Sequence, residues 1–583
     1  MMELTAIYHR PESEYAYLYK EDQLHIRIRT KINDVQKVIL HYGDPFIFIE
    51  DKYEAKKEMT KVTSDALFDY WQVTVSVDFA RIQYFFELLD EEGQGVFYGD
   101  KGCVEHTQEN LDAEGNGFKL PYIHEIDGCQ VPSWVSNTVW YQIFPERFAN
   151  GNPNLNPDGA REWDAAIAPN RDDFFGGDLQ GIIDHLDYLK DLGITGLYLC
   201  PIFEATTNHK YDTTDYFEID RHFGDKEVFR NLVEEAHKRG IKIMLDAVFN
   251  HIGYQSDQWQ DVLKNGEKSP YKDWFHIQEF PVTEDKLQNP RELPYHTFAF
   301  ASYMPKLNTA NPEVRDYLLS VATYWIENFD IDAWRLDVAN EIDHQFWKDF
   351  RKAVLAKKPD LYILGEIWHT SQPWLQGDEF HAVMNYPLSE SIKDYFLRQR
   401  KKTEQFISEI NSESMYYKQQ ISEVMFNLLD SHDTERILTT AKGNIQHVKA
   451  ALTFLYLQKG TPCIYYGTEL ALIGGPDPDC RRVMPWDRVS EDNDMLNFMK
   501  KLIKVRKEVA SIIQHGNYRL EEVKLDVLSL KWNYQGKEVQ AIFNQSKENF
   551  ILDRDSVDLA SHCQFKDGQQ VILPDGFIIT VSK

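Results

Sequence analysis

The first 124 residues alternate apolar and polar side chains with a period of two. Leu24, Ile26 and Ile28 are separated by polar or charged residues, and a similar alternation runs through residues 71–77. Turn signals such as Gly43-Asp44-Pro45 divide these runs. Because successive side chains of a strand point to opposite faces, this pattern is typical of strands with one buried face. We therefore predict an antiparallel β-sandwich for residues 1–124.

From about residue 135 the pattern changes to short apolar runs that alternate with stretches of helical periodicity. The predicted strands are Val139–Ile143, Gly196–Cys200, Ile241–Leu245, Ile331–Leu336, Leu361–Leu364, His381–Met384, Val424–Leu429 and Pro462–Tyr466. The predicted helices between most of them are Gly181–Leu192, Glu227–Arg239, Pro312–Asn328, Asp343–Lys357, Ile392–Arg400, Ile445–Lys459 and Met495–Glu508. Apolar strands in alternation with helices favour a parallel (β/α)8 barrel, which we assign to residues 125–509.

Two further regions depart from that alternation. After the third predicted strand, residues 251–309 are rich in aromatic and turn-forming residues and are too long for a simple loop, so we predict an inserted subdomain. After residue 510 the period of two returns, for example in Val527–Trp532 and Val539–Phe543. These runs predict a C-terminal β-sandwich over residues 510–583.

The composition narrows the possible functions. The 583 residues carry a formal net charge of −30, which argues against nucleic acid or an anionic membrane as a partner of the bulk surface. The six cysteines are scattered without metal-binding spacing, as expected for free thiols in a reducing compartment. The sequence shows no signal-peptide pattern and no long apolar run. We expect a soluble, cytoplasmic protein.

The fourth predicted strand ends in a pair of opposite charges. Arg335 and Asp337 are two residues apart, so their side chains leave the same face of the strand. Such a pair costs free energy to bury, and one reason to place it at a strand end is to keep a carboxylate ionised and oriented. The alternative interpretation is an ordinary ion pair of the core.

Two more carboxylates follow other predicted strands. Glu366 follows the fifth strand and Asp433 the seventh, and the C-terminal ends of barrel strands meet at one mouth. Repulsion among close carboxylates raises one pKa while an arginine lowers another, which yields an acid and a nucleophile from the same kind of group. Double-displacement glycoside hydrolysis requires that combination. Each carboxylate taken alone could equally be structural.

Five segments of the barrel carry a family resemblance. Met304–Asn308 is similar to a motif of cyclomaltodextrinases, maltogenic amylases and neopullulanases, and four other segments resemble the signature segments of the α-amylase superfamily: Asp246–His251, Ala333–Glu341, Leu364–His369 and Leu428–Asp433. The resemblance covers essentially the whole chain. It implies a retaining enzyme that cleaves α-1,4-glucosidic bonds in cyclomaltodextrins, pullulan and malto-oligosaccharides or starch, with transglycosylation as a second activity. The alternatives are a non-catalytic carbohydrate-binding protein with an amylase-like barrel and a glucosidase specialised for α-1,6 bonds.

The resemblance also implies roles for single residues. Asp337 would be the nucleophile, Glu366 the general acid/base and Asp433 the third carboxylate, which stabilises the transition state. Arg335 would hold Asp337 ionised. The resemblance places further substrate contacts at His209, Tyr211, His251, His432, Asp477 and Arg481, and on the acceptor side at Glu341 and Trp368. For Asp477 with Arg481 a solvated ion pair is the alternative, and for Trp368 simple packing.

A calcium ion and a second copy of the chain are the remaining expectations. By resemblance, the calcium loop comprises Asn150, Asn152, Asn156, Gly176 and Asp178. Calcium prefers oxygen ligands that include carboxylates, and Asp178 is the only carboxylate of this set, so an Asn-rich turn is the alternative. The resemblance further implies a homodimer through the N-terminal domain, which would narrow access to the catalytic site.

Overall fold

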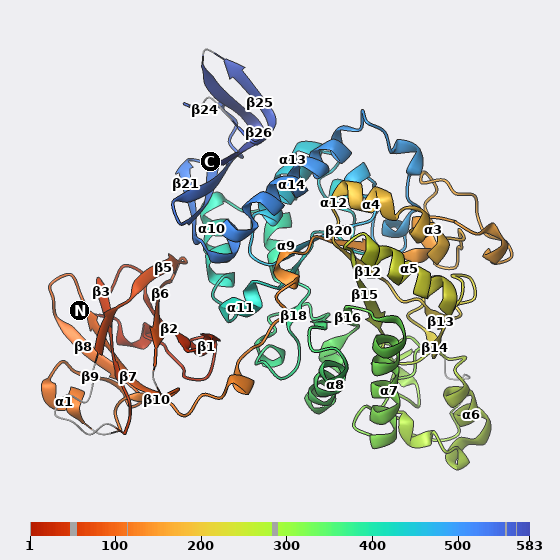
Figure 1. Ribbon diagram of the computed structural model, residues 1–583, viewed down its shortest axis with the longest axis horizontal. Coiled ribbons are helices and arrows are strands. Elements are labelled where there is room, and N and C mark those ends of the chain that lie inside the picture. The colour runs from red at the N-terminus through yellow and green to blue at the C-terminus, as the bar shows by residue number, and fades with distance from the viewer. Residues whose placement is uncertain are drawn as a thin grey trace.

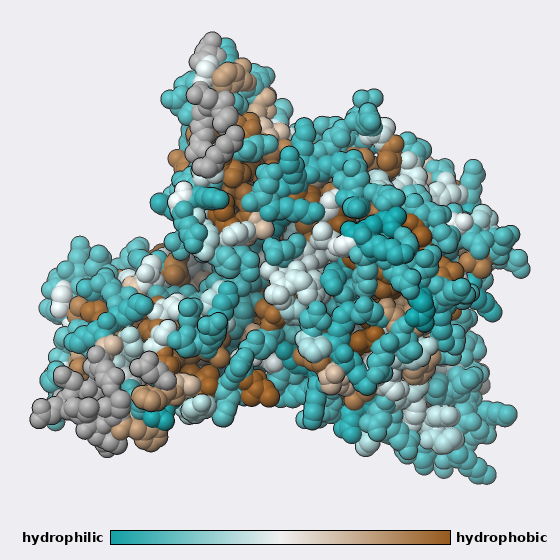
Figure 2. Space-filling view, in the orientation of Figure 1, coloured by the Kyte–Doolittle hydropathy of each residue, from teal (hydrophilic) through white to brown (hydrophobic). Residues whose placement is uncertain are grey.

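The computed structural model describes residues 2–46, 55–77, 79–113, 115–282, 290–553, 557–566 and 568–582. Figure 1 shows a central barrel with both β domains on one side of it, and α10 (Thr403–Glu413) lies between them. In the space-filling view the outline of the molecule is indented between the two β domains (Figure 2).

The N-terminal domain is the predicted antiparallel β-sandwich. One sheet contains β1 (Ala16–Lys20), β2 (Gln23–Lys31), β6 (Phe68–Ser76) and β5 (Thr60–Ser64). The other contains β3 (Lys37–Gly43), β4 (Ala55–Glu58), β7 (Ile82–Leu89), β8 (Gly95–Gly99), β9 (Gly102–Glu105) and β10 (Phe118–Leu120), with the short helix α1 (Gln108–Asp112) before β10. The predicted inward residues Leu24, Ile26 and Ile28 are fully buried between the sheets.

The barrel sheet contains all eight predicted strands in parallel order. They are β11 (Trp140–Ile143), β12 (Gly196–Leu199), β15 (Lys242–Ala247), β16 (Ala333–Leu336), β17 (Tyr362–Gly365), β18 (Ala382–Val383), β19 (Phe426–Asn427) and β20 (Thr461–Tyr465). Seven neighbouring pairs form a continuous ladder from β18 round to β19, and a parallel bridge between Met384 and Phe426 closes the ring. The predicted (β/α)8 barrel is therefore confirmed.

The helices surround this sheet. The helices up to the fourth strand, including one within the inserted segment, are α2 (Pro145–Phe148), α3 (Leu179–Asp184), α4 (Leu186–Leu192), α5 (Lys226–Lys238), α6 (Asp257–Asn265) and α7 (Pro312–Phe329). The later ones are α8 (His344–Lys357), α9 (Tyr386–Ile392), α10, α11 (Gln419–Ser422), α12 (Ile437–Thr440), α13 (Ile445–Tyr456) and α14 (Asp494–His515). The helix predicted at residues 392–400 differs: α9 begins at Tyr386 and passes into a π-helical turn, Lys393–Leu397. A proline in the first turn is compatible with this earlier start.

Two excursions leave the barrel at its C-terminal mouth. The hairpin β13 (Phe203–Ala205) and β14 (Thr213–Ile219), which the sequence pattern did not predict, carries the loop with His209 and Tyr211. The segment predicted as an inserted subdomain contains α6 and is held by isolated bridges such as His251 to Lys306. Residues 283–289 of that segment lie outside the described residues.

The C-terminal domain is one connected antiparallel sheet. It comprises β21 (Asn517–Lys524), β22 (Val527–Tyr534), β23 (Lys537–Asn544), β24 (Phe550–Leu552), β25 (Leu559–Lys566) and β26 (Gln569–Val581). The long strand β26 pairs with β23, β24 and β25, so one strand serves both halves of the predicted sandwich. Helix α14 continues to His515, beyond the predicted domain start at residue 510. Over the described residues, no helix is long and apolar enough to cross a membrane.

Candidate active site

One buried arginine lies at the centre of the site. Arg335, near the end of β16, is fully buried, and its Nη1 donates to Asp337 Oδ1 at 2.7 Å and to Asp246 Oδ1 at 2.9 Å. Its Nη2 lies 2.8 Å from Glu366 Oε1. The strands β15, β16 and β17 therefore each deliver a carboxylate to the same guanidinium, because parallel neighbours end at the same rim of the barrel.

One positive charge serves three carboxylates, and the pKa values of Asp246 and Asp337 are shifted in this environment. Burial raises the pKa of Asp246 to about 6, although Arg335 opposes the change. Burial, together with the nearby Glu366 and Asp246, also raises the pKa of Asp337 well above its ordinary value. Arg335 lowers the pKa of Asp337 as expected, but burial and the neighbouring carboxylates outweigh it.

The backbone after Asp337 holds Glu366. Val338 has φ 46°, a left-handed conformation that is rare for a β-branched residue. In this conformation its N–H donates to Glu366 Oε2 at 2.9 Å. The indole N–H of Trp368 donates to Glu366 Oε1 at 3.2 Å. Both carboxylate oxygens of Glu366 are thus oriented by fixed donors.

Trp368 lies at the edge of the site and not in the core. Its side chain is 48% exposed, and its ring stacks on the buried ring of Tyr386 with centroids 3.8 Å apart and an angle of 6° between the planes. Tyr386 begins α9, so this helix supports the aromatic surface beside Glu366.

Asp433 belongs to a second group of polar side chains. His432 Nε2 lies 3.0 Å from Asp433 Oδ2 and 2.6 Å from the hydroxyl oxygen of Tyr211. The Tyr211 hydroxyl donates to Asp246 Oδ2 at 2.9 Å, which joins this group to the arginine cluster. Burial, with Arg481 and Arg335 nearby, lowers the pKa of His432 well below its ordinary value, so the imidazole is neutral at physiological pH.

Two more histidines are fixed by the loop that carries Tyr211. His251 Nε2 lies 3.1 Å from the carbonyl oxygen of Tyr211, and His209 Nδ1 accepts the Tyr211 backbone N–H at 3.0 Å. The His251 ring also stacks on Phe298 of the inserted segment, with centroids 5.1 Å apart. Burial lowers the pKa of both histidines to about 3, so both are neutral hydrogen-bonding groups.

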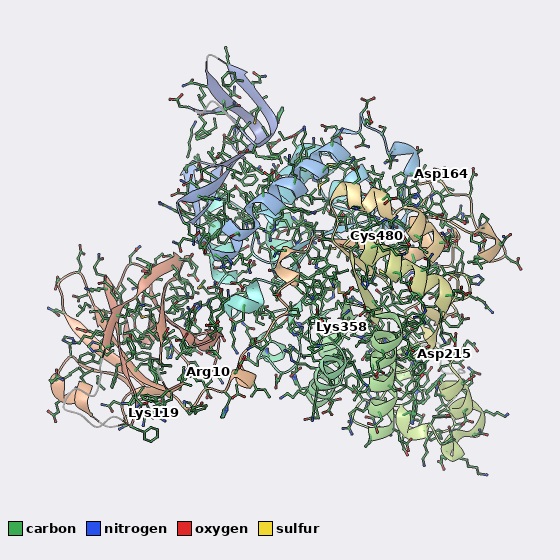
Figure 3. The ribbon with its side chains drawn as sticks, viewed as in Figure 1. Arg10, Lys119, Asp164, Asp215, Lys358 and Cys480 are labelled. Atoms are coloured by element: carbon green, nitrogen blue, oxygen red, sulfur yellow. The ribbon has the colours of Figure 1, made fainter. Side chains whose placement is uncertain are left out.

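Arg481 connects Asp433 to the outer part of the site. Its Nη1 lies 2.8 Å from Asp477 Oδ1 and its Nη2 lies 3.4 Å from Asp433 Oδ1. Its Nε donates to the His432 carbonyl oxygen at 2.8 Å. Cys480, labelled in Figure 3, precedes it and donates from Sγ to the same carbonyl at 3.2 Å. Arg481 is only 8% exposed, so the pair with Asp477 is not the solvated surface pair considered as an alternative.

These groups surround a cavity of about 880 Å³ at the mouth of the barrel. The predicted residues in its wall are His209, Tyr211, His251, Asp337, Glu366, Trp368, His432, Asp433, Asp477 and Arg481. Arg335 lies beneath the wall. Glu341 is exposed and lies outside the wall, where its carboxylate accepts a hydrogen bond from Asn340 Nδ2 at 3.2 Å.

Several residues of the site were not among the predicted set. Asp246 was recognised only as part of a motif, although it shares Arg335 with Asp337. The inserted segment adds Phe298 and Tyr303 to the cavity wall, and Arg171 lies there as well. The aromatic richness of residues 251–309 was the available signal, but it did not indicate which rings point into the cavity.

The predicted calcium loop surrounds the carboxylate of Asp178. This side chain caps α3, since Oδ1 accepts the Gly181 N–H at 2.7 Å and the Gly151 N–H at 3.1 Å. Oδ2 accepts the Asn152 N–H at 2.7 Å. Burial raises the pKa of Asp178 despite these donors. In the described part of the chain, no cationic side chain forms an ion pair with it.

The other loop residues leave oxygen atoms available. Asn150 Nδ2 donates to Asn156 Oδ1 at 2.9 Å, and Asn150 Oδ1 is buried without a partner among the described residues. Gly176 lies so close that an added Cβ would be 2.3 Å from Asn156 Oδ1. An unpartnered oxygen and a carboxylate without a cation fit a hard cation such as Ca²⁺. Over the described residues, no group of three or more His, Cys, Asp and Glu side chains is arranged to hold a metal.

The fold and the site together define a class of protein. Carboxylates at the ends of three neighbouring barrel strands, oriented by a shared arginine in an open cavity, are the arrangement of a (β/α)8 glycoside hydrolase.

Comparison with known proteins identifies the family. The chain matches "Alpha amylase, catalytic domain" over residues 142–508 and "Alpha amylase, N-terminal ig-like domain" over residues 1–124. This chain belongs to the α-amylase family.

Relatives in that family are similar over nearly their full length. The intracellular maltogenic amylase of Bacillus subtilis is 51% identical over 547 residues, which are 93% of this chain and 91% of the relative. A cyclomaltodextrinase of Geobacillus thermopakistaniensis is 51% identical over 512 residues, 88% of this chain and 86% of the relative. A solved cyclomaltodextrinase structure superimposes with a TM-score of 0.91 at 42% identity, and the match covers 100% of both chains.

Proposed function

We propose that this protein is a retaining glycosidase that cleaves α-1,4-glucosidic bonds in cyclomaltodextrins, pullulan and malto-oligosaccharides or starch. The observation that carries the proposal is the shared guanidinium: Arg335 contacts Asp337 at 2.7 Å and Glu366 at 2.8 Å in the same cavity. Two carboxylates bound to one guanidinium lie close together, and a short separation of about 5–5.5 Å is typical of retaining enzymes. The relatives named as maltogenic amylase and cyclomaltodextrinase support the substrate class.

In the first step, Asp337 attacks the anomeric carbon and Glu366 gives its proton to the departing glycosidic oxygen. The bond between the anomeric carbon and the glycosidic oxygen breaks. The products of this step are a covalent glycosyl-enzyme and a shortened glucan. In the second step, Glu366 takes a proton from water, and the resulting hydroxide displaces Asp337. If a sugar hydroxyl takes the place of water, the same step gives transglycosylation.

The remaining groups bind the sugar and stabilise the transition state. Asp433, fixed by His432 and Arg481, faces the reacting ring and stabilises positive charge as the oxocarbenium ion develops. The neutral His432 and His251 lie in the cavity wall, where they contact hydroxyl groups of the sugar. The aromatic ring of Tyr211 lies in the cavity wall, where it packs on the sugar face.

The decisive experiment compares hydrolysis of β-cyclodextrin, pullulan and starch by the wild type with that by Asp337→Asn and Glu366→Gln. We expect all three activities to fall together in both variants, with the products of the wild type retaining the α configuration by NMR. Wild-type activity in both variants, or β products, would refute the proposal. A wild type that binds β-cyclodextrin without cleaving it would favour a carbohydrate-binding protein.

We also propose that Ca²⁺ binds the loop of Asn150, Asn152, Asn156, Gly176 and Asp178. The unpartnered Asn150 Oδ1 and the buried Asp178 carboxylate support it. The ion would fix this loop and play no part in bond cleavage. Addition of Ca²⁺ after removal of metal with EDTA should raise the melting temperature of the wild type and leave that of Asp178→Asn unchanged.

Finally, we propose a cytoplasmic homodimer. The name of the intracellular relative supports the location, and the N-terminal domain, which in this chain packs beside the barrel, is the proposed contact surface. Light scattering that shows only monomer at micromolar concentration would exclude the dimer.

A further inference from the structure

A second cavity lies where the N-terminal domain, the barrel and the C-terminal domain meet. Its volume is about 480 Å³, and its wall shares no residue with the wall of the catalytic cavity. We call it the junction cavity. Helices α10 and α11 separate the two β domains at this place, as Figure 1 shows. Asn411 of α10 donates to the Ser64 carbonyl oxygen of the N-terminal domain at 2.8 Å, so the parts around the cavity are joined by direct contacts.

Aromatic rings from two of the three parts lie in the wall. Trp532 and Tyr518 come from the C-terminal sheet, and their ring centroids are 4.6 Å apart. Tyr416 and Tyr417 follow α10. The indole N–H of Trp532 donates to the Leu457 carbonyl oxygen at 2.8 Å, which fixes the ring. Rigid rings of this kind offer flat apolar surfaces at a low cost in conformational entropy.

Two charged side chains in the wall have unused hydrogen-bonding capacity. Among the described residues, none accepts a hydrogen bond from Lys459 Nζ or forms an ion pair with it, and burial lowers the pKa of this amine to about 8. Glu413 accepts the Ser391 hydroxyl at Oε1 at 2.7 Å, while its buried Oε2 has no hydrogen-bond partner in the part of the chain that the structure describes. Buried polar atoms without partners are costly and are commonly satisfied by a ligand or water.

The other cationic side chains of the wall already have hydrogen-bond or ion-pair partners in the protein. Arg27 donates to Gln72 Oε1 at 2.7 Å and to the Tyr417 carbonyl oxygen at 3.0 Å. Lys61 pairs with Asp69 at 3.2 Å. Over the described residues, one amine and one carboxyl oxygen of the wall therefore remain without a hydrogen-bond partner. This combination suits a neutral ligand with both donors and acceptors better than an anion.

We propose that the junction cavity is a non-catalytic binding site for a short α-glucan of two or three glucosyl units, such as maltose. A glucosyl unit presents apolar C–H faces to aromatic rings and hydroxyl groups to Lys459 and Glu413. The volume lies within the range of about 300–1,000 Å³ that is usual for small-molecule sites. The choice of ligand rests on the proposed function, because such glucans are its products.

The test separates the two cavities by ligand size. The full-length chain with Glu366→Gln is first saturated with β-cyclodextrin, a ring too large for the junction cavity, and maltose is then titrated in a calorimeter. We expect residual maltose binding. Adding Lys459→Met should weaken this binding by about tenfold, as expected for the loss of a hydrogen bond to a charged group. The matched control Lys501→Met removes an exposed lysine of α14 and should leave it unchanged.

Tyr416→Ala provides a second variant if Lys459→Met melts early, since Tyr416 is only partly buried. The proposal is overturned if no maltose binds after saturation, if neither variant weakens the binding, or if inorganic phosphate displaces maltose. The first titration, of β-cyclodextrin alone, reports on the catalytic cavity, so failure of the proposed function can be distinguished from failure of this site.

Discussion

The two ends of strand β16 and its neighbours carry opposite balances of charge. At the N-terminal end, the buried carboxylate of Asp332 is surrounded by basic side chains: Lys242 at 2.9 Å, Lys358 at 3.0 Å and His237 at 2.7 Å. Lys358 is labelled in Figure 3. At the C-terminal end, the single cation Arg335 is surrounded by carboxylates.

This difference changes the pKa values of the carboxylates at the two ends. Burial alone would raise the pKa of Asp332, but His237, Lys358 and Lys242 lower it below its ordinary value. At the other end, burial raises the pKa of Asp246, and burial together with the neighbouring carboxylates raises the pKa of Asp337. The first arrangement stabilises the barrel. The second gives up stability and holds carboxylates ready for proton and glycosyl transfer, in line with the division of roles between the two faces of such barrels.

The largest effect is expected for Asp337→Asn. This change removes the proposed nucleophile, so kcat for β-cyclodextrin hydrolysis should fall by about 10³- to 10⁵-fold. Stability should be kept or gained, because one of the crowded carboxylates becomes neutral. Rate assays and thermal melts test both points. A variant with kcat within tenfold of the wild type would contradict the assignment.

The next largest effect is expected for Arg335→Met. It leaves the buried carboxylates without their cation and should cost about 3–5 kcal/mol of unfolding free energy. The loss should grow as the pH rises from 5 to 8, because Asp246 and Asp337 stay protonated in the folded chain at pH values where the unfolded chain has released those protons. Urea unfolding at pH 5 and pH 8 measures the loss of unfolding free energy. A loss that is the same at both pH values would contradict the prediction.

Asp246 should give a pH-dependent contribution of its own. With a folded pKa of about 6 and an ordinary value of 3.8, it binds a proton more tightly in the folded chain. Its contribution to stability is full below about pH 4 and is lost as the pH rises through 6, by roughly 3 kcal/mol for an isolated group. Relative to the wild type, Asp246→Asn should therefore gain stability between pH 4 and pH 7. Unfolding curves that stay parallel over this range would refute the shift.

The smallest effect is expected for Asp332→Asn at the opposite end. The loss should be about 1–2 kcal/mol at pH 7, since the cations around it are partly exposed and can be hydrated, and kcat should stay within about twofold. Because the pKa of Asp332 is lowered, its contribution is present above pH 4 and disappears as the pH falls below that value. A large fall in kcat would show that the two ends of the strand do not have separate roles.

The sequence predicted the barrel well because buried parallel strands leave a simple signal. Each predicted strand is present, although β18 and β19 are shortened to two residues each, where only the bridge from Met384 to Phe426 closes the ring. Such shortening depends on how far neighbouring strands diverge, which apolar periodicity does not record.

The predicted site residues come together for the same reason, since strand ends share one rim. Glu341 is the exception: the turn after Asp337 leaves its side chain in solvent. The contribution of Phe298 and the sharing of Arg335 by Asp246 depend on tertiary packing between segments far apart in the chain. The junction cavity likewise exists only once three domains have docked, so nothing local in the sequence indicates it.

The left-handed backbone conformation of Val338 has a consequence for how the two reacting side chains move. Such a conformation costs about 1–3 kcal/mol and persists only where the surroundings enforce it. Here the peptide N–H that follows Asp337 also donates a hydrogen bond to Glu366. The side chains of the nucleophile and of the proton donor are therefore held by the same rigid segment of backbone. A change in the position of one carboxylate changes the position of the other. A substrate that displaces one of them therefore moves both.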